Sequence, residues 1–422
     1  MHLWRWLIVV LCGAGLGCAD RQLQCPVAGR TPARSADFTE RGDAQMVPTR
    51  SPFEWAALSS PVRWLPGRGY SGAFGSALAY DGSTLVVAAA KQAEFQSSAV
   101  YFFNVLSGTD GVIGIDSAAV LSIPSTLGAL GNCVASCSGG FVVSSYDNRL
   151  LWITREDGVW QLQGVIPGRS NARVDCPMDC SEEQMLVAFS EAGRRYVQRY
   201  DLVESQWRPV GAIGPFTEEV QSLVIGSSYA AVGVNGMVYV YDFWDSWEPK
   251  AKLEVDGAPH AMSTASGWLY VSVAQGLVVE RLLVFQSSGS GWGLVDEWEP
   301  GATDLVVQGA TVFAGYSAEP SGMRHQVGTV HVYQHADTGW RRVGVIVPPT
   351  DVPGQYFGRT LAASERELII GAPGHTHVSG AVYVLELPLG KELLGVDDAE
   401  WKVVPQRRLS PMFYAHGGYV YE

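Results

Sequence analysis

The sequence has no cluster of basic residues. Its 422 residues include 29 lysines and arginines against 42 aspartates and glutamates, which gives a formal net charge of -13 at pH 7. Proteins that bind nucleic acid neutralise phosphates with grouped Lys and Arg. The composition therefore excludes a nucleic-acid partner, and we interpret the acidity as a feature that favours solubility.

Long hydrophobic runs are also lacking. The apolar stretch that starts at Trp6 is far shorter than the ~20 residues that a membrane-spanning helix needs. It follows Arg5 and precedes small residues, as in an export signal peptide. The segment GLGC resembles a bacterial lipoprotein processing box, although Gly15 stands where that box usually carries leucine. We therefore expect a signal peptide over residues 1–18 and lipidation at Cys18, with ordinary cleavage near Ala19 as the alternative.

Catalytic signatures do not occur. The chain contains no G-x-S-x-G, H-E-x-x-H or P-loop pattern, and it has no N-x-S/T sequon. Scattered carboxylates fit solvated loop or edge positions better than an acid/base pair: Glu182, Glu183, Glu218 and Glu219. We expect no catalytic residues and no cofactor, and the missing sequons disfavour a glycosylated animal ectodomain.

Glycine and aromatic residues are abundant instead. The chain has 48 glycines and 14 tryptophans, with 47% hydrophobic and 17% charged residues. This composition predicts a sizeable core and an all-β protein with many turns. Residues 19–52 are polar and lack periodicity, so we predict a disordered tether there. Such a coil spans roughly 30 Å on average.

A repeated pattern occupies most of the chain. Phe357-Gly358, the run ELIIGA containing Gly371, and the run AVYVL match Phe74-Gly75, LVVAA and AVYFF near the start. Runs like the last one recur at seven places, which begin at Val100, Leu150, Val197, Val238, Leu282, Val330 and Val382. A period of 40 to 50 residues with several short strands is typical of a propeller blade. The sequence therefore predicts a seven-bladed β-propeller with four-stranded antiparallel blades over residues 53–411, followed by a tail over 412–422.

Tryptophans recur in step with these runs, at Trp160, Trp207, Trp247, Trp292 and Trp340. We predict that each lies on the outer strand of a blade and covers its exposed edge. Two segments resemble the outer strand of the last blade, one starting at Phe53 and the other at Glu400. We favour the second, which contains Trp401.

Residue types along the repeat fit a propeller. Inner strands covered on both faces should be continuous apolar runs. Glycines such as Gly75, Gly358 and Gly371 permit close backbone approach near the axis. We expect Phe74 and Phe357 to wedge between adjacent blades.

The motif FG…LVVGAP…GAVYVF makes the first and last blades resemble the FG-GAP repeat of integrin-α-type propellers and of many exported bacterial proteins. That resemblance implies a propeller used for binding, often with calcium held by a D-x-D-x-D-G loop. No such loop occurs here, and AAAKQAEFQSSA and GAPGHTHVSGA lack the carboxylates that calcium requires. We therefore expect no metal site.

Seven cysteines are present, and Cys12 would be lost with the signal peptide. Four share a C-x3-C spacing at equivalent places in the second and third blades: Cys133, Cys137, Cys176 and Cys180. In an exported protein we expect disulfides, with zinc or free thiols as alternatives. Pairing within each C-x3-C motif is the simplest arrangement, and pairing between the two blades is the alternative. Cys25 is left as an odd thiol on the tether.

These features predict an exported, lipid-anchored and non-catalytic binding or adhesion module of a bacterial cell envelope or cell surface. Its partner would be a protein or a polysaccharide, and only the lipid anchor would contact the membrane. The expected binding face comprises the loops that enter the inner strands and those after the GAP position, with the candidate residues Phe95, Arg324, His325, His375 and His377. An envelope-assembly scaffold docking one membrane complex is the first alternative, and a glycan-active enzyme is the second. We interpret the histidines as solvated and the Arg41-Gly42-Asp43 tripeptide as a chance match.

Overall fold

The computed structural model describes the following residues: 63–66, 74–89, 99–107, 113–121, 130–145, 147–169, 172–242, 247–276, 278–289, 291–317, 327–336, 339–348, 354–374, 380–387 and 399–402. Over these ranges the chain forms 29 β-strands and no helix. None of the described residues belongs to a helix that could span a membrane. The predicted signal peptide, Cys18, the tether and the tail lie outside the described residues.

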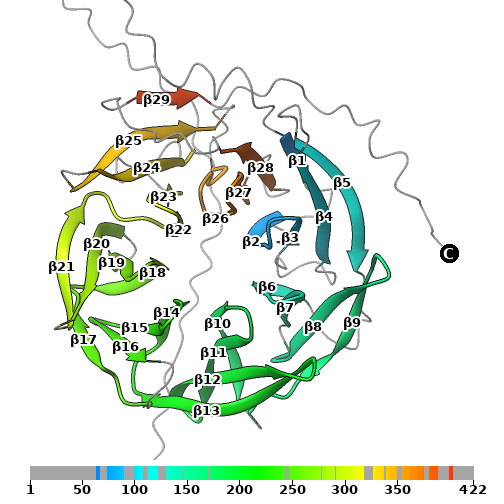
Figure 1. The fold of residues 1–422 in the computed structure, drawn as a ribbon, viewed down its shortest axis with the longest axis horizontal. Coiled ribbons are helices and arrows are strands. Elements are labelled where there is room, and N and C mark those ends of the chain that lie inside the picture. Colours follow the sequence, from blue (N-terminus) through cyan, green and yellow to red (C-terminus); the bar gives the residue numbers. More distant parts are fainter. Residues whose placement is uncertain are drawn as a thin grey trace, which may run out of the picture. The chain divides into compact units, whose positions relative to one another are not determined.

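Seven β-sheets are arranged as blades around a central axis (Figure 1). Blade 1 contains β2 (Phe74–Tyr80), β3 (Thr84–Ala89), β4 (Ala99–Ser107) and β5 (Ile113–Leu121). Blade 2 contains β6 (Leu130–Cys137), β7 (Gly140–Ser145), β8 (Leu150–Glu156) and β9 (Val159–Ile166). Blade 3 contains β10 (Arg173–Cys180), β11 (Gln184–Glu191), β12 (Arg194–Val203) and β13 (Gln206–Phe216). Blade 4 contains β14 (Val220–Ile225), β15 (Tyr229–Val234), β16 (Met237–Asp242) and β17 (Ala251–Glu254).

The remaining blades complete the ring. Blade 5 contains β18 (Ala258–Ala265), β19 (Trp268–Gln275), β20 (Val278–Ser288) and β21 (Gly291–Trp298). Blade 6 contains β22 (Asp304–Gln308), β23 (Thr311–Tyr316), β24 (Thr329–Ala336), β25 (Gly339–Val347) and β29 (Ala399–Lys402). Blade 7 contains β26 (Thr360–Ala363), β27 (Glu367–Ala372), β28 (Ala381–Glu386) and β1 (Arg63–Pro66). The predicted seven-bladed propeller is confirmed, and each of the seven recurring runs lies on the third strand of a blade.

The last blade closes differently from our prediction. β1 pairs antiparallel with β28, from Arg63 opposite Val384 to Pro66 opposite Ala381. β29 instead pairs parallel with β25 and adds a fifth strand to blade 6. The prediction that the Trp401 segment fills the outer place of blade 7 is therefore wrong. Both segments are four-residue strands that contain one tryptophan, so only their pairing in the folded ring distinguishes them (Figure 1).

The hydrophobic core lies between the blades. Seven clusters of buried side chains occur, and each combines residues from two neighbouring blades. The second strands are covered on both faces: β7, β15 and β27 are buried along their whole length. This burial explains why the second strands are continuous apolar runs rather than alternating patterns, as predicted.

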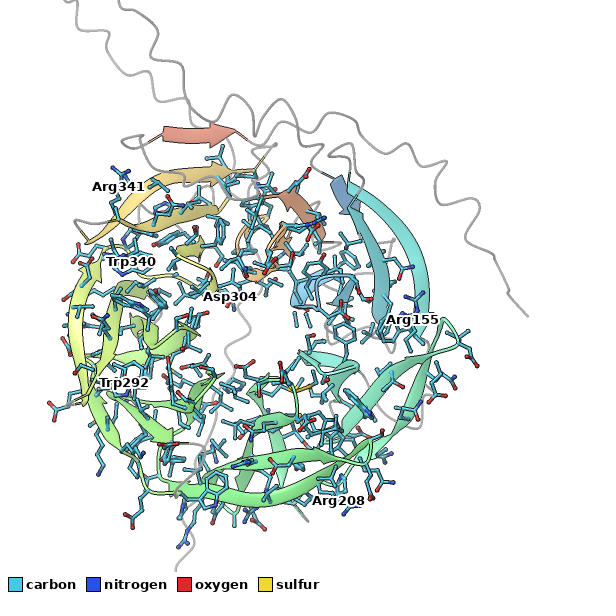
Figure 2. The ribbon with its side chains drawn as sticks, in the orientation of Figure 1. Arg155, Arg208, Trp292, Asp304, Trp340 and Arg341 are labelled. Carbon is cyan, nitrogen blue, oxygen red and sulfur yellow. A yellow bond between two sulfur atoms is a disulfide. The ribbon has the colours of Figure 1, made fainter. Side chains whose placement is uncertain are left out.

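The recurring tryptophans fill the seams between blades. Trp160 of β9 stacks on Phe102 of blade 1, with ring centroids 4.7 Å apart, and only 7% of its surface is exposed. Trp207 of β13 meets Trp152 of blade 2 edge to face at 5.6 Å. Trp292 and Trp340 likewise contact the preceding blade, through Tyr229 and Tyr270 respectively (Figure 2).

The outer-strand prediction is thus confirmed for these four tryptophans, but their predicted role in covering an exposed edge is wrong. Trp247 lies just before β17, with its side chain against Gly211 of blade 3. Burying large rings between sheets gains more apolar area than covering one strand edge.

The Phe-Gly pairs also lie at seams, as predicted. Phe74 packs with residues of blades 1 and 7, and Phe357 packs with residues of blades 6 and 7. Gly75 and Gly358 have φ values of +88° and +81°. A Cβ at Gly358 would lie 2.7 Å from the carbonyl oxygen of Thr329. Both the backbone conformation and the approach of the next blade therefore require glycine.

Polar groups link inner strands across several seams. The Ser222 hydroxyl donates to the carbonyl of Pro259, and the Thr360 hydroxyl donates to the carbonyl of Gly75, at 2.6 and 2.7 Å. The Asp179 carboxylate accepts the backbone N–H of Ile225 at 2.7 Å. These bonds hold neighbouring blades in register near the axis.

Candidate functional site

The two ends of the propeller differ in the length of their connections. We call the end at which the inner strands begin the loop end, and the opposite end the turn end. In an antiparallel blade, the connection from the second to the third strand and the connection into the next inner strand both emerge at the loop end. The connections from first to second strand and from third to fourth strand emerge at the turn end.

The longest connections lie at the loop end, although residues 243–250 form a long connection at the turn end of blade 4. Turns from the first to the second strand never exceed three residues, as in residues 81–83 and 138–139. At the loop end, residues 90–98, 317–328 and 373–380 join the second and third strands of blades 1, 6 and 7. Long connections on a rigid scaffold are the usual carriers of binding residues. The loop end is therefore the candidate binding surface.

The predicted binding residues belong to these three connections. Phe95 falls in residues 90–98, Arg324 and His325 in 317–328, and His375 and His377 in 373–380. All five lie outside the described residues, so their participation stays a prediction. The carboxylates expected to be solvated, Glu182, Glu183, Glu218 and Glu219, are exposed in the structure.

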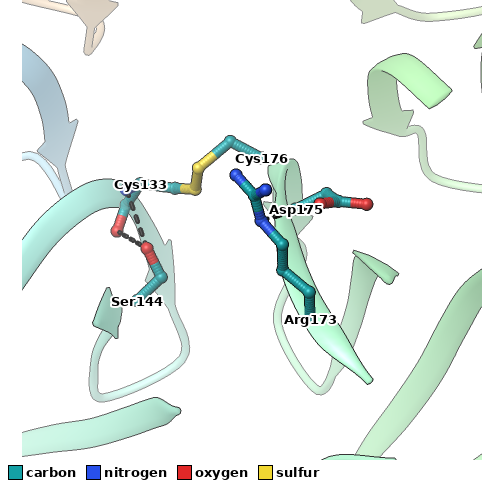
Figure 3. Close-up of a disulfide and its surroundings, with 5 residues drawn as sticks. All are labelled: Cys133, Ser144, Arg173, Asp175 and Cys176. Carbon is teal, nitrogen blue, oxygen red and sulfur yellow. Dashed lines mark hydrogen bonds and ion pairs between the residues drawn. A yellow bond between two sulfur atoms is a disulfide. The ribbon is translucent and has the colours of Figure 1, made fainter. Parts of the chain in front are cut away.

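Two disulfides join the inner strands of blades 2 and 3. Cys133 pairs with Cys176, with a Cα–Cα distance of 6.0 Å (Figure 3). Cys137 pairs with Cys180, with a Cα–Cα distance of 5.3 Å. The simplest predicted pairing, within each C-x3-C motif, is wrong, and the alternative between blades is confirmed. Residues four apart on a straight strand lie roughly 13 Å apart, too far for a disulfide. Equivalent positions on neighbouring inner strands lie within the required distance.

The first of these bridges is supported on both sides. Cys133 N–H donates to the Ser144 hydroxyl at 2.9 Å, and that hydroxyl donates back to the Cys133 carbonyl at 3.4 Å. Beside Cys176, Arg173 pairs with Asp175 at 3.6 Å (Figure 3). The disulfides thus form a covalent seam between blades 2 and 3, with one bridge in the middle of the inner strands and the other at the turn end.

A charged group that sequence reasoning missed lies at the loop end of blades 5 to 7. Asp304, the first residue of β22, lies at the inner margin of the ring (Figure 2). Its carboxylate accepts the backbone N–H of Leu305 at 2.9 Å and that of Leu361, in blade 7, at 2.6 Å. Burial raises the pKa of Asp304 to about 6, although these two hydrogen bonds and the charge of Arg359 oppose the shift.

Arg359 and His260 accompany this carboxylate. Arg359 precedes β26, His260 lies on β18, and both are exposed. Burial lowers the pKa of His260 below its usual range, and the positive charge of Arg359 lowers it further. These residues belong to three separate blades, so no local sequence pattern could have grouped them.

Tyr356 is the other unusual residue at this end. It has a φ of +53°, which is rare for a bulky side chain, and 37% of its surface is exposed. Its carbonyl accepts the N–H of Arg359 at 3.1 Å. A Cβ on Gly374 would lie 2.6 Å from the Tyr356 ring, so the ring rests directly on that glycine. The strained backbone thus holds an exposed aromatic ring at the loop end, three residues before Arg359.

No group of three or more His, Cys, Asp or Glu close enough to hold a metal ion occurs within the described ranges. The cysteines with zinc-like spacing form the two disulfides instead.

Comparison with known proteins identifies the fold alone. No protein-family model matches the chain, and no curated protein matches its sequence. A chain from a crystal structure of a mitotic checkpoint complex is similar, with a TM-score of 0.58 and 16% identity over 86% of this chain and 99% of that one. The crystal structure of Saccharomyces cerevisiae Sqt1 gives a TM-score of 0.51 and 12% identity, over 77% and 98% of the two chains. The protein is a seven-bladed β-propeller.

Proposed function

We propose that this propeller is a non-catalytic binding module that presents its loop end to a protein or polysaccharide partner. The observation that carries the proposal is the difference between the two ends. Turns of at most three residues join the first and second strands at one end of every blade, and residues 243–250 of blade 4 are the long exception there, whereas the longest connections gather at the other end. A rigid ring with loops concentrated at one end suits recognition of a broad surface.

Export and anchoring form part of the same proposal. Two disulfides between blades support an oxidising compartment, since cytosolic proteins rarely keep such bonds. The N-terminal segment with Cys18 supports a lipid anchor in a bacterial cell envelope, with residues 19–52 as a tether. The Phe-Gly and GAP-like motifs of blades 1 and 7 support membership of the FG-GAP type of propeller.

Site-specific photocrosslinking tests which end binds the partner. A photoreactive phenylalanine would replace Arg173, Glu218 or Asn235, which are exposed at the loop end. Matched controls would replace Asp157, Glu183 or Glu204, which are exposed at the turn end. We expect irradiation of cells that produce the protein to give high-mass adducts from loop-end positions alone. Adducts from turn-end positions alone, or from neither set, would overturn the proposal.

The anchor is tested separately. Cys18→Ser should move the protein from the membrane fraction to the soluble fraction and remove an acyl mass from its mature N-terminus. A protein that fractionates identically with and without the substitution would refute lipidation, while leaving the binding proposal intact.

A further inference from the structure

The two disulfides between blades 2 and 3 lie in different local structure. Cys133 lies in the irregular stretch of the β6–β7 ladder, and Cys176 lies in the bulge of β10. Cys137 and Cys180 lie in regular ladder pairs instead. The strand ladders therefore restrain the backbone less at the first bridge than at the second, and bulges of this kind often lie next to functional sites.

The first bridge also presents one of its cysteines to solvent. Cys176 is exposed, whereas only 7% of the surface of Cys133 is exposed. In the second bridge, Cys137 is buried and Cys180 is half-buried. Thiol–disulfide exchange requires an external thiolate to reach one sulfur of the bridge, and exposed disulfides are the labile ones. Cys176 is therefore the most accessible point of attack among the four cysteines.

The second bridge can hold the seam without the first. Each disulfide alone would close a loop between cysteines 43 residues apart. Once Cys137 and Cys180 are joined, the other bridge closes only the small ring made of residues 133–137 and 176–180. A smaller ring restricts the unfolded chain less, so the first bridge adds less stability than it would alone. Opening it leaves blades 2 and 3 covalently joined.

The charged groups beside Cys176 favour the approach of an anion. The Asp175 carboxylate, one residue before Cys176, pairs with Arg173 at 3.6 Å (Figure 3). It also pairs with Arg195 at 3.9 Å and accepts the Ser190 hydroxyl at 3.2 Å. Two guanidinium groups therefore outweigh one carboxylate, and 74% of the Arg173 side chain is exposed. A thiolate that approaches Cys176 is attracted by this excess positive charge.

We propose that Cys133–Cys176 is a thiol-exchange site, which a small anionic thiol opens at Cys176 while Cys137–Cys180 keeps blades 2 and 3 joined. The attacking thiolate forms a bond to the Cys176 sulfur, and the bond between the two cysteine sulfurs breaks. Its electron pair leaves with the Cys133 sulfur, which takes up a proton from water. One disulfide replaces another, so the step needs no oxidant. Cys176 becomes a mixed disulfide, and the backbone of Cys133 stays hydrogen-bonded to Ser144.

Glutathione, an anionic tripeptide thiol, provides the probe. The oxidised full chain would be treated with glutathione, sampled at early times, alkylated and digested with trypsin. We expect residues 92–149 and 174–194 to stay linked, with one glutathione on Cys176 and one alkyl group on Cys133 by mass spectrometry. Opening of the second bridge should be at least tenfold slower. Equal rates at both bridges, faster opening of Cys137–Cys180, or no reaction at either would overturn the proposal.

Two double variants isolate the bridges. Cys137→Ser with Cys180→Ser retains only the first bridge, and Cys133→Ser with Cys176→Ser retains only the second. Each variant is the matched control for the other, because both lack one disulfide of the same seam. We expect glutathione to open the retained first bridge at least tenfold faster than the retained second bridge. The peptides of the original protein test the proposal even if one variant does not fold.

Substitution of Arg173 tests the selection of an anionic thiol. Arg173→Gln should slow the reaction with glutathione at least twofold and leave the reaction with neutral 2-mercaptoethanol unchanged. Arg208→Gln, which removes an arginine at the outer rim, is the control and should slow neither reaction (Figure 2). Equal slowing of both thiols by Arg173→Gln would overturn the selection of an anion. Failure of the exchange would leave the binding proposal intact, since photocrosslinking at the loop end involves no thiol.

Discussion

Gly358 is constrained in two independent ways at the scale of a single residue. Its φ of +81° disfavours any other residue, and a Cβ there would meet the Thr329 carbonyl. Gly82 has a similar φ of +91°, but nothing lies within 4 Å of its Cβ position. A comparison of substitutions at Gly358 and Gly82 therefore separates the effect of backbone conformation on stability from the effect of blade packing.

We expect Gly358→Ala to lower the free energy of unfolding by about 2–4 kcal/mol, since it combines a left-handed backbone with a steric clash. Gly82→Ala should lower it by about 1 kcal/mol, from the backbone term alone. Urea denaturation followed by intrinsic tryptophan fluorescence would measure both. Equal losses would show that the approach of blade 6 to Gly358 is not tight.

The raised pKa of Asp304 predicts that the stability of the folded protein depends on pH. Burial raises its pKa to about 6 in the folded protein, whereas an unfolded aspartate has a pKa of about 3.9. Between these values the folded state binds more protons, so the contribution of Asp304 to stability is greatest below about pH 4 and is lost as the pH rises through 6. The full difference is about 2–3 kcal/mol.

Asp304→Asn removes the titrating group. We expect its denaturation midpoint to depend less on pH between 4 and 7 than that of the original protein, whatever the absolute stability of the variant. Asp157→Asn, at an exposed turn, is the control and should leave the pH profile unchanged. A profile of Asp304→Asn parallel to the original would contradict the raised pKa.

At the scale of elements, the two ends of the chain have unequal roles. β1 supplies the outer strand of blade 7 and joins the N-terminal part of the chain to its last blade. β29 adds an extra parallel strand to a blade that already has four. Removing the first opens the ring, and removing the second leaves every blade with four strands.

We therefore predict different results from two deletions. Deleting residues 63–66 should lower the melting temperature markedly and create new sites for limited proteolysis in blade 7, because the edge of β28 is exposed. Truncation before residue 399 should change the melting temperature by only a few degrees. Calorimetry and proteolysis with mass spectrometry would measure both, and the reverse order of stability would assign closure to β29.

At the scale of the whole molecule, the ring is held by seven apolar seams, and the seam between blades 2 and 3 is also covalent. Each disulfide connects cysteines 43 residues apart and ties blade 2 to blade 3. A cross-link of this span restricts the unfolded chain, and its removal costs about 2–4 kcal/mol. The other seams depend on packing and on hydrogen bonds between inner strands.

The pairing of the cysteines can be read from the peptides that trypsin releases. Under non-reducing conditions, trypsin should release residues 92–149 and 174–194 as one linked species, since each peptide contains both cysteines of one C-x3-C motif. Reduction should separate them and lower the stability by about 2–4 kcal/mol. Two unlinked peptides, each with an internal disulfide, would contradict the pairing between blades.

The sequence by itself determined the all-β class, the number of blades and the identity of the seam glycines. These features repeat along the chain, and the period of a repeat survives even where its residues vary. The third-strand runs and the Phe-Gly pairs are local patterns, so they could be found without coordinates. The four cysteines were also predicted to form disulfides from their equivalent positions.

Only the tertiary structure decided which cysteines pair, which end of the chain closes blade 7, and where the tryptophans point. Each of these depends on contacts between blades, and local patterns do not encode the position of a neighbouring blade. The same reason explains why the sequence did not group His260, Asp304 and Arg359. They are far apart in the chain, and the packing of blades 5, 6 and 7 side by side brings them to one end of the propeller.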